Sequence, residues 1–337
     1  IDVLTSVKRI GINYQENRGT FLPGYLPSVG AIGTLKPSAG FIFGSQADVR
    51  YEAARRGWLT VFPEFNQQFV QLKDQQLDVQ ANLEIIPDLI IDLSANRLYS
   101  ENSTENFRVD NSDYYALTPN TYGNLNISTI LLGSAFMKSN EEYSKAFENF
   151  KENRIIIANR LAEAYYGSSN YPVDADGFPV GFGKTSQDVL LPAFMAAYSG
   201  KSASSVKTGY KRDVPLPNWD LKYTGLMKAE WFKENFNRFS LHHGYRAAYT
   251  INQFHSNLDY DANTPEATTQ NGNFKSKMLI GNVALTEQFS PLIKIDMEMK
   301  NDISILAEYR KDRALSLSFA NNLLTEVKGD EIILGLG

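Results

Sequence analysis

The sequence predicts an all-β protein of antiparallel strands with one inserted amphipathic helix. Three observations indicate this fold class. Apolar and polar residues alternate with a period of two in many segments, as on strands with one apolar face. Short polar stretches separate these segments, so we expect tight turns between neighbouring strands. One long stretch, 139–167, has apolar residues at helical spacing instead.

The first predicted hairpin covers residues 77–95, where apolar residues alternate with Asp, Gln, Asn and Glu. Pro87-Asp88 interrupts the pattern, and a proline cannot donate to a strand ladder, so we place the turn there. Residues 125–131 repeat the alternation. A longer strand is predicted within 236–254. Thirteen residues of strand span about 43 Å, or about 30 Å when tilted, which is enough to cross a bilayer core.

The inserted helix is predicted from its two ends. Ser139 followed by Glu142 forms a capping box, and Gly167 is suited to the C-cap. Charged residues mark one side of this helix, so it is amphipathic and too polar to span a membrane. A second helix is predicted over 186–200, with Pro192 near its middle.

Residues 291–320 predict a meander of strands, with turns at Asn301-Asp302 and at Lys311-Asp312-Arg313. If the apolar face of this meander contacts lipid, its residues are Ile293, Ile295, Met297, Met299, Ile303 and Ile305. The residues then expected to face a water-filled lumen are Lys294, Asp296, Glu298, Lys300, Glu308 and Arg310.

The composition excludes several classes of protein. The chain of 337 residues has a net charge of -5 and no basic block, so we expect no nucleic-acid partner. It contains no cysteine, which excludes disulfides, zinc–thiolate sites and cysteine nucleophiles. No segment reaches the ~18 uncharged apolar residues of a spanning helix, so a helical membrane protein is excluded.

Candidate sites for chemistry are weak. His242 and His243 are adjacent on a predicted strand, so they point to opposite faces and cannot hold one metal ion together. The segment 174–183 begins like a calcium loop but lacks the later acidic ligands. The Gly-Lys-Thr at 183–185 lacks the first glycine of a phosphate loop, since position 178 is Phe. We therefore expect no enzyme, no metal site and no cofactor.

The alternation alone leaves the partner of the apolar face open, since a soluble sandwich shows the same pattern. Charges that keep to one parity, short turns and aromatic residues near strand ends favour an outer-membrane barrel, where a lipid-facing Lys or Arg costs roughly 2–4 kcal/mol. Such a barrel could be a small-solute porin or a plugged receptor. The soluble alternative is a β-sandwich adhesin or carbohydrate-binding module.

Long stretches of the chain resemble the C-terminal region of the SprA/Sov family. They include GINYQENRGTFLPGYLPSVG (11–30), SQADVRYEAARRGWLT (45–60), GKTSQDVLLPAFMAAYSGK (183–201), FSLHHGYRAAYTINQF (239–254) and DRALSLSFANNLLTEVKGDEIILGLG (312–337). Members of that family are very large outer-membrane proteins that form the translocon of the type IX secretion system, and some are named for gliding motility.

The resemblance implies that 1–337 is part of one outer-membrane β-barrel, a segment of a very large antiparallel transmembrane β-barrel, with 139–167 inserted in it. It implies a pore that exports folded cargo proteins bearing C-terminal sorting domains across the bacterial outer membrane. The partners implied are the remainder of its own large chain, membrane lipid, a PorV-type barrel shuttle protein, a plug protein and a periplasmic prolyl isomerase. The family has no catalytic residues to carry over.

Overall fold

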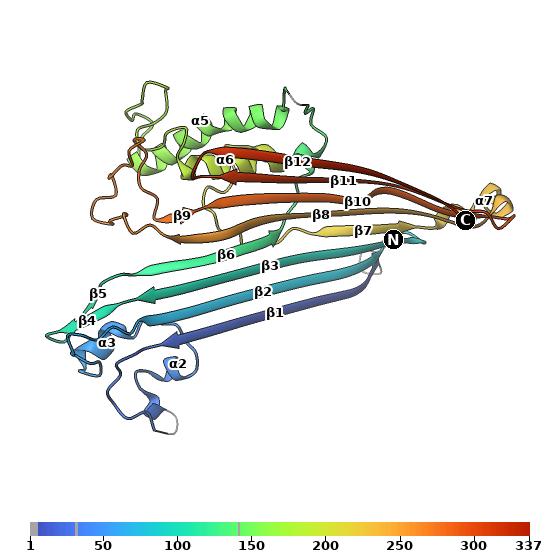
Figure 1. Cartoon of the computed structure of the whole chain (residues 1–337). Helices are drawn as coiled ribbons and strands as arrows, with labels where there is room; N and C mark the ends of the chain where they lie inside the picture. Colours follow the sequence, from blue (N-terminus) through green and yellow to red (C-terminus); the bar gives the residue numbers. More distant parts are fainter. Residues whose placement is uncertain (1–5, 31–32, 141) are drawn as a thin grey trace.

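The computed structural model describes residues 6–30, 33–140 and 142–337, and antiparallel sheet dominates them (Figure 1). The predicted all-β class with antiparallel strands is confirmed. β4 (Phe107–Asp110) and β5 (Asp113–Ala116) form a small separate hairpin. The strands of the main sheet are β1 (Val7–Phe21), β2 (Phe69–Glu84), β3 (Leu89–Glu105), β6 (Asn120–Ser128), β7 (Asn218–Tyr223), β8 (Phe236–Ser256), β9 (Met278–Ile280), β10 (Asn282–Met299), β11 (Ser304–Ser318) and β12 (Leu323–Leu336).

The order across the main sheet is β1-β2-β3-β6-β8-β10-β11-β12. β7 pairs with β3 and β8, the same two neighbours as β6, so β6 and β7 lie in line and share one strand position. The backbone N–H of Leu216 donates to the carbonyl of Ser128 at 3.0 Å, and the Ser128 hydroxyl donates to the carbonyl of Leu216 at 2.7 Å. Residues 129–217 are therefore an insertion that leaves and re-enters the sheet at one point.

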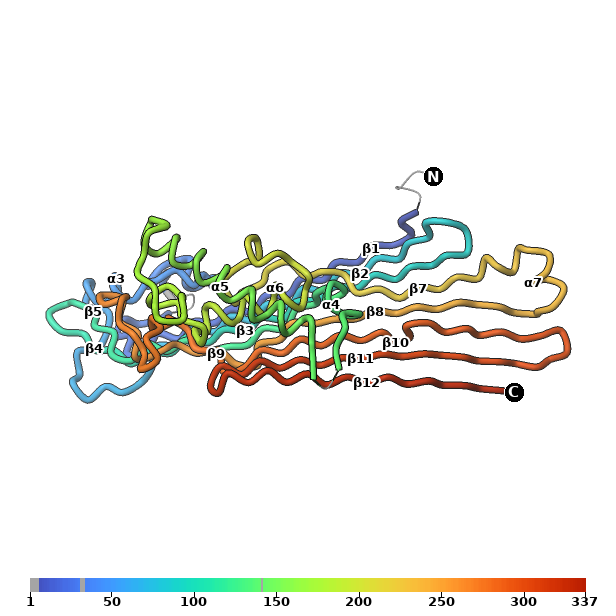
Figure 2. Tube along the Cα trace, turned by 90° about the horizontal axis from the view of Figure 1, so that it is seen from above, coloured from blue at the N-terminus to red at the C-terminus, as the bar shows by residue number. Residues whose placement is uncertain are grey.

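The insertion contains α4 (Leu132–Ala135), α5 (Lys145–Tyr166) and α6 (Gln187–Ser199). α6 is almost wholly buried and lies between α5 and the sheet, because Phe194 and Tyr198 belong to the same core as sheet residues Tyr249 and Leu315. Figures 1 and 2 show these helices over one half of the sheet, while the other half consists of bare strands with α7 (Glu230–Asn235) at its tip.

Register assigns every strand residue to one of two faces, because directly paired residues point to the same side. We call the side against α6 the helix face and the other side the polar face. Tyr249 of β8 pairs with Leu285 of β10, which pairs with Leu315 of β11, so all three lie on the helix face. Along β8, β10 and β11, every second residue from these three also lies on the helix face. Between Phe289 and Ile293, β10 has two residues more than its neighbours, and because this number is even, the residues beyond it stay on the same faces.

A second, smaller core lies in the connection between β1 and β2, around α2 (Ala39–Ile42) and α3 (Arg50–Arg55). Arg50 joins this core to the sheet end, because its guanidinium donates to Glu105 at 2.8 Å and to Asp48 at 2.8 Å. Among the described residues, no helix is long and apolar enough to cross a membrane.

Several sequence predictions match the structure. The hairpin over 77–95 is β2 and β3 with its turn at Pro87-Asp88, and the long strand over 236–254 is β8. The helix over 186–200 is α6 with Pro192 inside it, and Gly167 caps α5 in the left-handed conformation.

Two sequence predictions were wrong. The inserted helix does not start at Ser139: its N-cap is Ser144, whose hydroxyl accepts from the N–H of Phe147. Glu141, one of the charged residues in the segment 139–167 predicted to be helical, lies outside the described residues. Lys311-Asp312-Arg313 is not a turn, because β11 continues through it. Its charges are accommodated by partners on adjacent strands, Asp330 for Lys311 and Glu287 for Arg313.

Gly133 sets the distance between α4 and the end of α6. A Cβ on Gly133 would lie 2.5 Å from the Cα of Gly200, which caps α6 with a φ of +73°. We expect Gly133→Ala to push α4 away and lower the free energy of unfolding by about 1–3 kcal/mol. Urea titration against the wild type measures this. Gly281→Ala is the control for a glycine-to-alanine change without a clash, since a Cβ there meets no atom within 4 Å and the backbone is not left-handed.

Candidate functional site

The half of the helix face that α4, α5 and α6 leave uncovered is apolar across the whole sheet. We call this surface the apolar belt. Its members on β2 and β3 are Leu77, Val79, Ala81, Leu83, Leu89, Ile91, Leu93 and Ala95. Its members on the other strands are Ile10, Ile12, Trp219, Leu221, Tyr223, Phe239, Leu241, His243, Ile293, Ile295, Met297, Ile305, Ala307, Ile332, Leu334 and Leu336.

No Asp, Glu, Lys or Arg is a member of the apolar belt as the described strands define it, and Arg97, which pairs with the belt residue Leu77 on the same face, lies at its border. His243 is its one imidazole, and the Nδ1 of that ring lies 2.7 Å from the carbonyl oxygen of Leu292. Belt side chains are open to the outside: Ile12 is 69% exposed, Ile293 50% and Leu334 78%. A contiguous apolar surface of this extent is rare on a soluble monomer.

Aromatic residues border the apolar belt on both sides. On the side toward α6, Trp219 stacks on Tyr245 with 4.5 Å between ring centroids. At the sheet edges of this border, Tyr14 donates to Glu16 at 2.9 Å and Tyr309 to Asp330 at 2.6 Å. The far border holds a cluster of rings from α7 and the start of β8: Trp231, Phe232, Phe236 and Phe239.

The height of the belt can be read along β8. Phe239 and Tyr245 are six residues apart, about 20 Å along the strand, which is about 15 Å in height at a strand tilt of roughly 40°. The hydrophobic band of outer-membrane barrels is about 25 Å tall and is flanked by aromatic girdles. Charged side chains return to the helix face beyond the aromatic border, among them Glu16, Glu287 and Asp330.

The polar face opposite the belt is lined with charged and amide side chains that pair across strands. Arg238 meets Asp296 at 3.0 Å, and Lys294 meets Glu308 at 3.7 Å. Arg310 joins Glu308 to the neighbouring strand. Apolar residues are sparse on this face opposite the belt: Ile90, Leu306 and Ile333.

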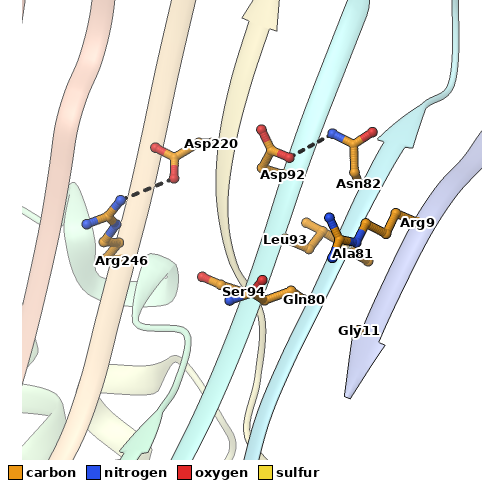
Figure 3. Close-up of a pocket in the computed structure, with 10 residues that line it drawn as sticks. All are labelled: Arg9, Gly11, Gln80, Ala81, Asn82, Asp92, Leu93, Ser94, Asp220 and Arg246. Atoms are coloured by element: carbon orange, nitrogen blue, oxygen red, sulfur yellow. Dashed lines mark hydrogen bonds and ion pairs between the residues drawn. The ribbon is translucent and has the colours of Figure 1, made fainter. Parts of the chain in front are cut away.

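A cavity of about 600 Å³ lies on the polar face, between β1, β2, β3, β7 and β8 (Figure 3). Two polar contacts cross its floor, from Arg246 to Asp220 at 3.3 Å and from Asn82 to Asp92 at 2.7 Å. Ser94 and Leu93 of β3 both line this cavity, but the register places the Leu93 side chain on the helix face, in the apolar belt, and the Ser94 side chain on the polar face. One strand therefore presents apolar and polar residues to two different surroundings.

The residues predicted to face lipid or a lumen are placed as follows. Ile293, Ile295, Met297 and Ile305 share the helix face, and Met297 pairs directly with Ile305. Met299 pairs with Phe236 at a register shift, and Ile303 lies in the turn before β11. The residues on the polar face are Lys294, Asp296, Glu298, Glu308 and Arg310. Lys300 lies in the turn after β10.

Sequence reasoning missed the ion network that fixes the insertion to the sheet. The Arg313 guanidinium donates to Glu287 at 2.7 Å and to the hydroxyl of Ser134 in α4 at 2.9 Å. The Tyr245 hydroxyl donates to Glu287 at 2.8 Å and accepts from the N–H of Leu131 at 2.8 Å. Arg313 is 6% exposed and Glu287 3%. Charged residues within an apolar alternation were the signal for this network.

Asp188 provides a pH-sensitive contact between α6 and the connection from β8 to β10. Burial raises the pKa of the Asp188 carboxyl, although the Ser276 hydroxyl donates to it at 2.9 Å. The folded protein therefore binds this proton more tightly than the unfolded chain, and the carboxyl reduces stability as pH rises above about 4.

Asp188→Asn keeps an acceptor for Ser276 without the charge. We expect it to raise the unfolding midpoint at pH 7 and to leave the midpoint unchanged at pH 3.5. Thermal unfolding at both values measures this. Equal midpoints at pH 7 would contradict the assignment, and Asp259→Asn on the exposed loop is the control.

A comparison with protein-family models matches none of them, and a comparison with curated proteins gives no significant match.

Proposed function

We propose that this chain is a wall segment of a large outer-membrane barrel that serves as the protein-conducting translocon of the type IX secretion system. The observation that supports a membrane wall is the apolar belt, free of charge on one face and backed by an ion-paired polar face. In this arrangement lipid covers the belt and water fills the lumen beside the polar face.

The sheet edges support a larger closed structure. β1 pairs only with β2 and β12 only with β11 among the described strands. In lipid, every backbone polar group must be paired within the protein. Both edges therefore need further strands, which the remainder of the chain would supply.

Loop lengths orient the wall. The connections beyond the α7 end of the belt are short, at 85–88 and 300–303, with 224–235 containing α7. Those at the other end are mostly longer, at 22–68, 106–119 and 257–281, with one short turn at 319–322. Outer-membrane barrels have short periplasmic turns and longer outer loops. We therefore place α7 at the periplasmic side, and the insertion 129–217 on the outer surface of the wall above the membrane.

The protein-conducting function follows from the resemblance to the SprA/Sov family. Cargo with C-terminal sorting domains would pass along the polar face. The PorV-type shuttle, the plug protein and the prolyl isomerase are proposed partners on the same basis.

Site-specific photo-crosslinking in living cells tests this function. A photoreactive residue at Ser94 or Asp296, on the polar face, is expected to crosslink to exported cargo while secretion is arrested. The same residue at Leu93 or Ile295, one position away, is expected to crosslink to no cargo.

Absence of cargo adducts from Ser94 and Asp296 would contradict the translocon. If channel conductance then persisted, the result would favour the small-solute porin. A protein that stayed in the aqueous fraction would favour the soluble adhesin.

A further inference from the structure

The segment that returns from α6 to β7 is rich in cations and borders the apolar belt. It contributes Lys201, Lys207, Lys211 and Arg212, and Arg97 of β3 lies beside it, donating to the carbonyl of Arg212 at 2.9 Å. A cavity of about 280 Å³ opens here, with Lys201, Lys207 and Arg212 in its lining. We call these three residues the basic pocket.

Positive charge exceeds negative charge around the basic pocket. Asp213 is the acidic residue in its lining, and this carboxylate pairs with Lys207 at 2.9 Å and with Arg97 at 3.7 Å. Within the described chain, Lys201 and Arg212 make no ion pair. The Arg212 guanidinium donates instead to the backbone carbonyls of Gly209, Lys207 and Lys211.

Positive charge is also in excess around Lys211, which lies next to the basic pocket in the sequence. Its ammonium donates to the hydroxyl of Tyr99 at 2.9 Å and lies 4.0 Å from the centre of that ring. Burial and the nearby Lys73 and Arg97 lower the pKa of Lys211, while Glu101 and Asp213 oppose them. An anion near this group would relieve the repulsion between the cations.

The other part of the pocket lining is apolar and points to a lipid rather than to a free ion. It includes Ile127, Leu216 and Val214, and Val214 is 76% exposed. Leu216 is hydrogen-bonded to Ser128 at the junction of β6 and β7. Trp219, at the border of the belt, follows three residues after Leu216. The cations therefore stand directly above the apolar belt on its own face.

We propose that the basic pocket binds the phosphate of an anionic lipid in the outer leaflet, with the acyl chains lying along the apolar belt below Val214 and Trp219. This inference rests on the proposed membrane placement and adds a specific ligand class to it. The phosphate oxygens would accept from Lys201, Lys207 and the free donors of Arg212, as cations bind phosphate elsewhere. Bound lipid would brace the strand position that the insertion interrupts.

Native mass spectrometry of the intact protein, transferred from zwitterionic phosphatidylcholine nanodiscs, tests the proposal. Titrated phosphatidylglycerol is expected to give a retained lipid adduct. In Lys201→Gln/Lys207→Gln we expect affinity to fall about 30-fold, since each lysine near an anionic lipid surface contributes about a fivefold factor. Both side chains are exposed, so this variant should fold. Lys184→Gln/Lys277→Gln, far from the belt, has the same charge change and should bind normally.

Two results would overturn the proposal: equal phosphatidylglycerol binding by both double variants, or displacement of the lipid by inorganic phosphate at equal concentration, which would indicate a free-anion site. The membrane placement is tested separately by the oxygen accessibility of Ile295. If oxygen reaches Ile295 but both double variants bind phosphatidylglycerol equally, only the proposal of a lipid site at the basic pocket is contradicted. If oxygen does not reach Ile295, both proposals fail.

Discussion

Arg313→Met is expected to destabilise the protein by about 3–5 kcal/mol, because it leaves a buried carboxylate without its cation. Glu287 is 3% exposed and is bonded at 2.7 Å to the guanidinium that would be lost. The same guanidinium holds α4 through Ser134, so the insertion would loosen from the sheet. Urea titration of the protein in lipid vesicles measures the change.

The double variant Arg313→Met/Glu287→Gln separates the lost ion pair from a packing defect. Glutamine keeps an acceptor for the Tyr245 hydroxyl without a buried charge, so we expect most of the stability to return. Lys311→Met is the matched control on the same strand. Its ion pair with Asp330 is partly open to solvent, with the Asp330 side chain 50% exposed, and surface pairs contribute about 1 kcal/mol or less. A double variant no more stable than Arg313→Met would contradict the role of the ion pair.

Leu93→Arg is expected to cost up to about 2–4 kcal/mol in a bilayer, because it places a cation within the apolar belt. Leu93 pairs with Ala81 on one side and with Trp219 on the other, so belt residues flank it and no counter-charge lies beside it. The urea midpoint in lipid vesicles measures the cost.

Ser94→Arg is the matched control for Leu93→Arg. It introduces the same side chain one residue along β3, where it enters the polar cavity beside Asp92 and Asp220. We expect a change below about 0.5 kcal/mol at this aqueous surface. Equal costs at positions 93 and 94 would show that the two faces do not differ in their surroundings.

The alternation of apolar and polar residues was enough to predict the antiparallel strands and the two faces of the meander. Ile295 and Asp296 lie on opposite faces because successive side chains of a strand point to opposite sides of the sheet, whichever strands it pairs with. The error at Lys311–Arg313 has a physical cause. Three consecutive charges resemble a turn unless their partners are known, and Glu287 and Asp330 come from neighbouring strands.

Long-range features could not be predicted from local patterns. Nothing near Ser128 shows that the strand continues at Asn218 after an insertion, because that continuity depends on pairing with β3 and β8. The position of the basic pocket beside β3 needs the same information, since Arg212 of the pocket and its contact Arg97 on β3 are far apart in the sequence. The apolar belt also extends to β1 and β12, beyond the residues that the meander predicted.

Spin-label accessibility tests the membrane wall most directly, and the absence of cysteine makes single labels simple to place. Nitroxides at Leu93, Ser94, Ile295 and Asp296 of the intact protein in nanodiscs would be compared for relaxation by oxygen and by a water-soluble nickel complex. A wall with lipid on one face predicts oxygen access at Leu93 and Ile295 and nickel access at Ser94 and Asp296. Shielding of Leu93 and Ile295 from both reagents would mean that protein covers the apolar belt, and would contradict the account.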